Sequence, residues 1–207
     1  MSDVSAIMQL APVIPVLTVA RAEDAKPLAE ALAAGGLYAL EVTLRTPAAL
    51  DVIREMADVQ GTVVGAGTVL NAKDFAAARD AGARFIVTPG LSDTVIADAG
   101  AAGVPILPGV ATASELMRGL DLGLAHFKFF PAEQAGGAAM LKAFAGPFGA
   151  VRFCPTGGVT TANASSYLSL PNVLCVGGSW IATPEQIAAG DWAGITARAR
   201  AAAALRP

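Results

Sequence analysis

One of the four lysines, Lys128, lies inside the apolar run HFKFFPA (residues 126–132), whose composition predicts a β-strand. An ammonium group that leaves water must be paired or give up its proton. Two interpretations follow: a lysine at a strand edge that reaches solvent, or an inward lysine whose pKa is lowered by burial among the flanking phenylalanines. In the second interpretation the neutral amine is a nucleophile that can condense with a carbonyl compound. The other three lysines, which we expect to be solvated, fall in helical segments: Lys26, Lys73 and Lys142.

A carboxylate and a guanidinium lie on one face of another predicted strand, ALEVTLR (residues 39–45). Alternation along a strand places Glu41, Thr43 and Arg45 on the same side. In the strand predicted around Lys128, it places Lys128 and Phe130 on one face. Glu41 either forms an ion pair with Arg45 that fixes the strand end, or serves as a general acid/base beside the lysine. Arg45 has a planar fork that suits a substrate carboxylate, so the two interpretations are compatible. In GAGTVLN, Thr68 either caps the strand or offers its hydroxyl to such a carboxylate.

Two glycine-rich turns follow the last two predicted strands: PTGGVT (residues 155–160) and VGGSW (residues 176–180). Backbone N–H groups in such turns, where they open onto a helix N-terminus, bind anions such as phosphate. The alternative is that the glycines only allow tight packing of helices on strands. Two such turns in neighbouring positions favour a phosphate site.

Composition and charge argue against several classes of function. The net charge is −3 without a basic cluster, so we expect neither nucleic acid nor membrane as a partner. The single histidine, His126, argues against a multi-histidine metal site, and we expect no metal. Cys154 and Cys175 lie in apolar runs without a CxxC spacing, which predicts reduced core thiols. No basic flank precedes the apolar N-terminal stretch and no run is long enough to span a membrane, so we expect a cytoplasmic protein.

A repeated supersecondary unit must position these residues. Short β-branched or apolar runs recur about every two dozen residues. We count eight predicted strands, at residues 13–19, 38–44, 62–67, 84–89, 104–109, 126–131, 151–158 and 173–178. Alanine-rich segments of helical periodicity lie between them and include residues 23–34, 48–57, 72–82 and 113–123. This order predicts an α/β protein with a (β/α)8 TIM barrel, a single domain over residues 1–207 with a short N-terminal segment before the first strand.

Composition and helix start signals agree with this prediction. A hydrophobic fraction of 54% and a charged fraction of 15% are typical of parallel strands covered on both faces, or of a subunit interface. A doubly wound open sheet is the alternative, although it normally has fewer strands and a glycine-rich turn after the first one. Thr112 with Glu115 predicts a capping box, and Thr183 followed by Pro184 predicts another helix start. Barrel enzymes carry catalytic groups at the C-terminal ends of their strands, which is where we look for them here.

Several long motifs resemble those of the 2-keto-3-deoxy-6-phosphogluconate (KDPG) and 2-keto-4-hydroxyglutarate (KHG) aldolase family: EVTLRT, VGAGTVLN, FKFFPAE, VRFCPTGG and VLCVGGSW. The resemblance runs from about residue 12 to about residue 195. It implies a (β/α)8 barrel, usually a homotrimer. By matching motif, it implies Lys128 as the Schiff-base lysine and Glu41 as the acid/base. It further implies substrate binding by Arg45, Thr68, Pro89, Phe130 and Thr156, and phosphate binding by Gly157, Gly158, Gly178 and Ser179.

The activity implied by this resemblance is that of a class I aldolase of the Entner–Doudoroff pathway, a lyase of carbohydrate metabolism. Such an enzyme cleaves KDPG into pyruvate and glyceraldehyde 3-phosphate, often acts on KHG as well, and uses a covalent lysine in place of a metal or organic cofactor. Two alternatives stay open on the sequence alone. One is a phosphosugar isomerase or synthase barrel without a covalent lysine, and the other is a non-catalytic protein that binds a phosphorylated metabolite.

Overall fold

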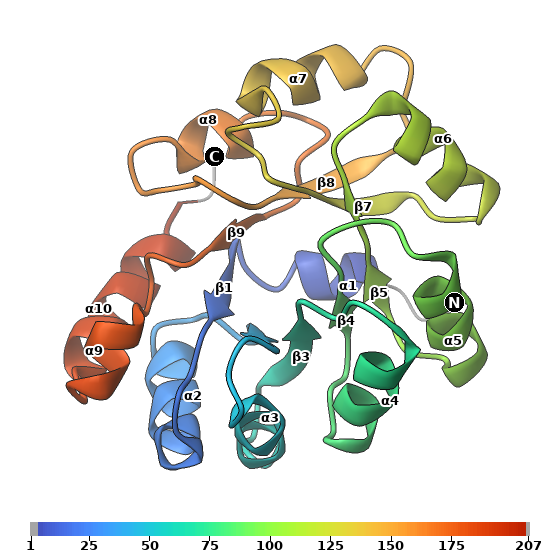
Figure 1. The fold of residues 1–207 in the computed structure, drawn as a ribbon. Coiled ribbons are helices and arrows are strands. Elements are labelled where there is room, and N and C mark those ends of the chain that lie inside the picture. The colour runs from blue at the N-terminus through green and yellow to red at the C-terminus, as the bar shows by residue number, and fades with distance from the viewer. Residues whose placement is uncertain (1–3, 206–207) are drawn as a thin grey trace.

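Strands and helices largely alternate along the chain, and all the helices except the first lie outside a curled sheet (Figure 1). The structure is a computed structural model that describes residues 4–205. Its strands are β1 (Val13–Leu17), β2 (Ala39–Thr43), β3 (Val63–Gly67), β4 (Ile86–Val87), β5 (Ile106–Leu107), β6 (Gly109–Val110), β7 (His126–Phe129), β8 (Arg152–Pro155) and β9 (Val176–Gly178). Its helices are α1 (Val4–Met8), the 3-10 helix η1 (Ala22–Asp24), α2 (Ala25–Ala34), α3 (Ala49–Ala57), α4 (Ala72–Asp80), α5 (Asp93–Ala102), α6 (Ala113–Asp121), α7 (Gly137–Phe144), α8 (Ala164–Leu168), α9 (Pro184–Ala188) and α10 (Trp192–Ala203).

All eight predicted strand segments contain a strand, but the fifth is divided. Residues 104–109 give the end-to-end pieces β5 and β6, with Pro108 between them. A proline has no N–H to donate to a neighbouring strand, which interrupts regular pairing at this point. Its carbonyl still accepts a hydrogen bond from the Lys128 N–H, at 2.9 Å. This segment therefore pairs with β4 through β5 and with β7 through β6.

Every strand pairing is parallel, and neighbours in the sheet follow one another in the chain, except that β1 pairs with β9. Six strands pair in the order β5-β4-β3-β2-β1-β9, and three pair in the order β6-β7-β8. Two isolated parallel bridges, Phe153 with Val173 and Thr156 with Gly177, link β8 and the residue after it to the segment that contains β9. The chain is thus an α/β protein with a curled parallel sheet in which the first strand pairs with the last. This is not the strand order of the doubly wound alternative.

Apolar side chains fill two separate spaces. The larger cluster lies between the sheet and the surrounding helices and includes residues from Ala11 to Ala202. The smaller one lies inside the curl of the sheet, where Val4, Ile7 and Met8 of α1 pack with inward residues of several strands. In Figure 1, α1 is seen within the ring of strands. The sequence predicts only a short segment before the first strand, because five residues are too few to show helical periodicity.

Both predicted helix start signals are confirmed. Thr112 and Glu115 form a capping box at α6, and the Thr183 side chain caps α9, with Pro184 in the first turn. The side chains of Asn71, Ser92 and Asp191 cap α4, α5 and α10 in the same way. In the described part of the chain, no helix is long and apolar enough to cross a membrane.

Candidate active site at the end of the curled sheet

Two charged side chains from distant parts of the sequence meet inside the sheet. Lys128 on β7 and Glu41 on β2 form an ion pair, with Lys128 Nζ 3.2 Å from Glu41 Oε1. The side chains are only 6% and 4% exposed. Lys128 therefore does not reach solvent, and the strand-edge interpretation is wrong. Each charge supplies the partner that burial of the other requires.

Glycines on the neighbouring strands make room for this pair. In the sheet register, Glu41 lies beside Gly65 of β3, and Lys128 lies beside Gly109 of β6. A Cβ atom on Gly67 would lie 2.2 Å from Glu41 Oε1, far inside van der Waals contact. The carboxylate therefore occupies the space that a side chain at position 67 would take. The sequence analysis did not single out Gly67, although the run of small residues VGAG was the available signal.

One aromatic ring lies beside the lysine. The centroid of the Phe130 ring is 5.2 Å from Lys128 Nζ, a distance typical of a cation–π contact. Phe127 and Phe129 point to the other side of β7 and are fully buried against the helices, where Phe129 packs edge-to-face on Phe144. The expectation that the lysine side chain is buried among all the flanking phenylalanines is therefore wrong. Only Phe130 shares its face, as strand alternation requires.

The residues expected to bind a substrate carboxylate follow three consecutive strands. Arg45 lies in the turn after β2 with an exposed side chain, Thr68 follows β3 and is half-buried, and Pro89 lies in the bend after β4. Because the strands are parallel, these residues lie along one edge of the sheet. Within residues 4–205 Arg45 forms no ion pair, so the alternative contact between Arg45 and Glu41 is not found.

Thr68 has an unusual backbone conformation. Its φ of 60° makes it the one non-glycine residue with positive φ among those the structure describes. A β-branched residue is disfavoured there, and such conformations gather at functional sites where the surroundings hold them in place. Hydrogen bonds on both sides do so here: Leu44 N donates to Gly67 O at 2.8 Å, and Val69 N donates to Val87 O at 3.3 Å. The backbone thus fixes the place of the Thr68 side chain.

The first glycine-rich turn is attached to the strand that carries the buried lysine. Thr156 N donates to Phe129 O at 2.9 Å, and Ala132 N donates to Thr156 O at 2.8 Å. A Cβ atom on Gly157 would lie 3.3 Å from the ring of Phe130. The turn and the lysine therefore lie beside the same aromatic side chain. Thr156 itself is buried.

The remaining glycine-turn residues lie where β8 and β9 end. Gly158 is exposed, with φ of +76°, a conformation that favours glycine. Gly178 is the last residue of β9, and the exposed Ser179 follows it. The helices that follow these turns begin a few residues further on: α8 at Ala164, and α9 at Pro184, where the Thr183–Pro184 signal predicts a helix start. Any anion at these turns would meet loop backbone rather than helix ends.

The two cysteines and the three remaining lysines lie where the sequence analysis expected them. Cys154 and Cys175 are free, buried thiols. A hydrogen bond with Cys154, together with burial, raises the pKa of the Cys175 thiol well above its usual value, so that it stays protonated and inert. Lys26, Lys73 and Lys142 are exposed, as predicted. Among residues 4–205 no three His, Cys, Asp or Glu side chains are grouped so that they would hold a metal ion.

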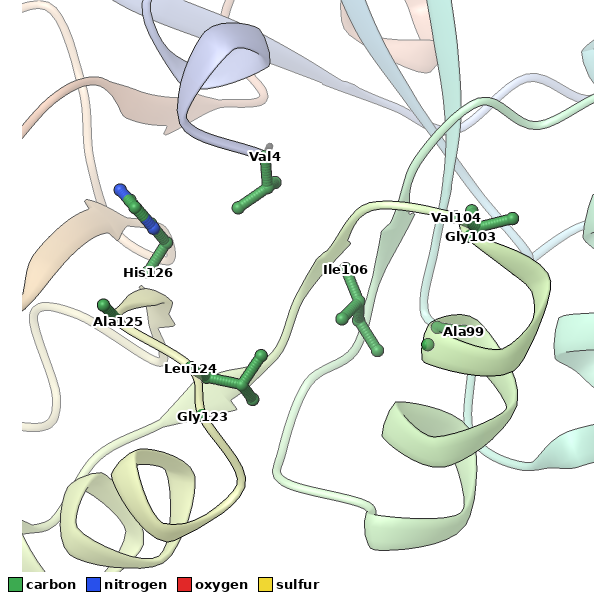
Figure 2. Close-up of a pocket in the computed structure, with 10 residues that line it drawn as sticks. Val4, Ala99, Gly103, Val104, Ile106, Gly123, Leu124, Ala125 and His126 are labelled. Carbon is green, nitrogen blue, oxygen red and sulfur yellow. The ribbon is translucent and has the colours of Figure 1, made fainter. Parts of the chain in front are cut away.

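A cavity lies at the edge where β5 and β7 begin. Its volume is about 190 Å³, and Figure 2 shows Val4, Ile106, Leu124 and His126 among its lining residues. The lining is mostly small and apolar, with His126 as its one titratable side chain. It contains none of the residues that the sequence analysis assigned to a site.

Comparisons with known proteins agree with this arrangement. The family model described as KDPG and KHG aldolase matches residues 4–198. The KHG/KDPG aldolase of Escherichia coli K12 is 50% identical, over 97% of this chain and 95% of the relative.

Two solved structures are also close relatives. The 2-keto-3-deoxy-6-phosphogluconate aldolase of Zymomonas mobilis ZM4, solved with 3-phosphoglycerate, is 54% identical, with a TM-score of 0.95 over 100% of this chain and 97% of that one. The KDPG aldolase of Legionella pneumophila is 46% identical, with a TM-score of 0.95 over 98% of this chain and 99% of that one. The Legionella structure holds pyruvate, captured at low pH as a covalent carbinolamine intermediate.

Proposed function

The chain belongs to the KDPG and KHG aldolase family, whose members are lyases, and we propose that it cleaves KDPG into pyruvate and glyceraldehyde 3-phosphate through a Schiff base on Lys128. The observation that carries this proposal is the buried contact between Lys128 and Glu41. The covalent pyruvate intermediate of the Legionella relative supports the same chemistry, which uses no external cofactor. KHG is proposed as a second substrate, in line with the name of the Escherichia coli relative.

The paired lysine and carboxylate supply the proton transfers of this reaction. Glu41 accepts a proton from Lys128 Nζ, and the resulting neutral amine attacks the C2 carbonyl. A proton then moves from the attacking nitrogen to the C2 oxygen, which gives a carbinolamine. Glu41 returns its proton to the new C2 hydroxyl, which leaves as water, so that an iminium forms. Glu41 then takes the C4 hydroxyl proton, directly or through a water molecule. The C3–C4 bond breaks, its electrons pass to the iminium, and the aldehyde leaves. Protonation of the enamine at C3 and hydrolysis release pyruvate and the free lysine.

The two ends of the substrate would be held by different loops. Arg45 and Thr68 bind the carboxylate, while Pro89, Phe130 and Thr156 line the pocket around the reacting carbons. The strained Thr68 backbone and the contact between Phe130 and Lys128 Nζ support these roles. The phosphate lies against backbone N–H groups of the two glycine turns, at Gly157, Gly158, Gly178 and Ser179. Positive φ at the first two of these glycines supports an anion-binding turn.

The finer architecture is also part of the proposal. We infer a closed eight-stranded barrel in one domain, because β5 continues into β6 and the isolated bridges beside β8 lead on to β9. A continuous apolar cluster from Ala11 to Ala202 supports the single domain. We also propose a cytoplasmic homotrimer. The free thiols support a cytoplasmic location. The exposed apolar residues Met117 and Leu120, on one face of α6, support a subunit contact, and sedimentation velocity would detect the trimer.

Borohydride trapping with pyruvate tests the central step. In the presence of pyruvate and sodium borohydride, we expect the wild-type protein to gain one reduced pyruvate adduct that peptide mass spectrometry maps to Lys128. Lys128→Met should show neither adduct nor KDPG cleavage while keeping the circular dichroism of the folded protein, because a methionine fills the apolar site without providing a nucleophile. Lys142→Met, on an exposed position of α7, is the matched control and should keep both properties.

The trapping experiment also separates the alternatives. An isomerase barrel without a covalent lysine, or a protein that only binds a phosphorylated metabolite, would give no adduct. An adduct on another lysine, or substantial cleavage by Lys128→Met, would remove Lys128 from its assigned role.

A further inference from the structure

A buried tyrosine bonds to an acidic residue beside the first glycine turn. The side chain of Tyr167, on α8, is fully buried, and its hydroxyl donates a hydrogen bond to Glu133 Oε1. Burial, together with this hydrogen bond, raises the pKa of Tyr167 far above its usual value. The hydroxyl therefore stays protonated and remains a donor at every physiological pH. Glu133 is an exposed residue of the loop after β7.

Glu133 contacts the glycine turn through both its backbone and its side chain. Glu133 N donates to Gly157 O at 3.1 Å. A Cβ atom on Gly158 would lie 2.6 Å from Glu133 Cγ, so the methylene groups of the glutamate cover that glycine. On the carbonyl side of the turn, Asn163 Nδ2 donates to Gly158 O at 3.1 Å. The turn is thus held between one side chain from the loop after β7 and one at the start of α8.

The charge of Glu133 conflicts with the role proposed for this turn. A carboxylate against a phosphate-binding turn repels the ligand, and a free side chain would be able to swing toward the anion. Its contact with Tyr167 prevents this movement. A Cβ atom on Gly137 would lie 3.4 Å from Tyr167 Oη and 3.6 Å from Glu133 Oε1, so the two oxygens are held against the first residue of α7.

We propose that Tyr167 and Glu133 are positioning residues for the phosphate end of the substrate. Tyr167 holds the carboxylate beside Gly137, so that the methylene groups of Glu133 support the Gly158 turn while its charge is kept from the anion. This inference rests on the proposed function of the turn, and it adds two residues that touch neither the reacting carbons nor the phosphate.

The test is the selectivity of Tyr167→Phe between two substrates. We expect kcat/KM for KDPG to fall by about ten-fold or more, because a freed carboxylate near the phosphate weakens its binding. KHG, which carries no phosphate, and the rate of borohydride trapping with pyruvate should stay within about two-fold of wild type. The double variant Tyr167→Phe/Glu133→Gln should recover most of the loss on KDPG, since the amide carries no charge.

Other outcomes overturn the inference. Equal losses on KDPG and KHG, or no recovery in the double variant, would show that Tyr167 serves only packing. Glu133→Gln alone keeps an acceptor for Tyr167 and should leave kcat/KM for KDPG unchanged or higher. A selective fall with that variant would overturn the inference even if Tyr167→Phe does not fold, which circular dichroism would show.

Gly158→Asp separates this inference from the proposed phosphate site. The substitution puts a side chain and a negative charge on the turn itself, and should penalise KDPG far more than KHG. If Gly158→Asp is selective and Tyr167→Phe is not, only the positioning role fails. If Gly158→Asp affects both substrates equally, the phosphate site itself is misplaced.

Discussion

At the scale of single residues, the site depends on two buried charges that stabilise each other. Lys128 and Glu41 are nearly inaccessible, and an isolated charge of either sign would be costly at that depth. As a pair they are neutral, and a proton can move between them without changing the total charge.

Arg45 gives a prediction at this scale. Arg45→Lys should raise KM for KDPG and the pyruvate concentration needed for half-maximal borohydride trapping by about ten-fold, since an ammonium cannot make the two parallel hydrogen bonds of a guanidinium. kcat should change less. Arg84→Lys, at an exposed arginine just before β4, is the matched control and should behave as wild type. An unchanged KM in Arg45→Lys would exclude Arg45 from the carboxylate site.

At the scale of elements, β3 shapes the site through Gly65 and Gly67, which have no side chains. A Cβ atom on Gly65 would lie 2.5 Å from the ring of Phe85, and one on Gly67 would collide with Glu41. Glycine in a strand lowers its intrinsic stability, and in β3 it lets side chains of other segments lie flat against the backbone. The strand thereby sets where the Glu41 carboxylate can lie.

Gly67→Ala tests this role of β3. The added methyl group should displace the carboxylate from Lys128 and lower kcat for KDPG by about a hundred-fold, since small misplacements of a catalytic group have effects of that size. Gly100→Ala, on α5 with open space around the glycine, is the control and should leave kcat unchanged. If both variants retain wild-type kcat, the close approach of Gly67 to Glu41 has no catalytic importance.

At the scale of the whole molecule, the sequence predicted the strands better than their ends. Period-two alternation correctly placed Glu41, Lys128 and Phe130 on inward faces, because strand geometry is local. The division of the fifth strand at Pro108 and the start of α8 at Ala164 were not predicted, because they depend on which neighbours each segment meets. The contacts of Gly67 with Glu41 and of Tyr167 with Glu133 join residues far apart in the chain, and no local pattern reports them.

The packing of α1 inside the sheet gives a prediction about stability. Met8 is completely buried, so Met8→Ala should lower the free energy of unfolding by about 2–5 kcal/mol through lost burial and a residual cavity. Urea unfolding followed by circular dichroism measures the change. Met140→Ala, at a methionine with 36% exposure on α7, should cost much less. Equal losses in the two variants would mean that α1 contributes little to the inner core.

The position of α1 also affects how the chain folds during synthesis. The helix is synthesised before any of the strands, yet the residues it packs against include Ile14, Phe85, Leu107, Cys154 and Cys175, which span most of the chain. Its binding surface is complete only when the last strand has been made. Until then the surface that buries Val4, Ile7 and Met8 is incomplete, so the nascent chain exposes these apolar side chains while the strands are being made. A segment that is made before every strand is therefore among the last to reach its native place.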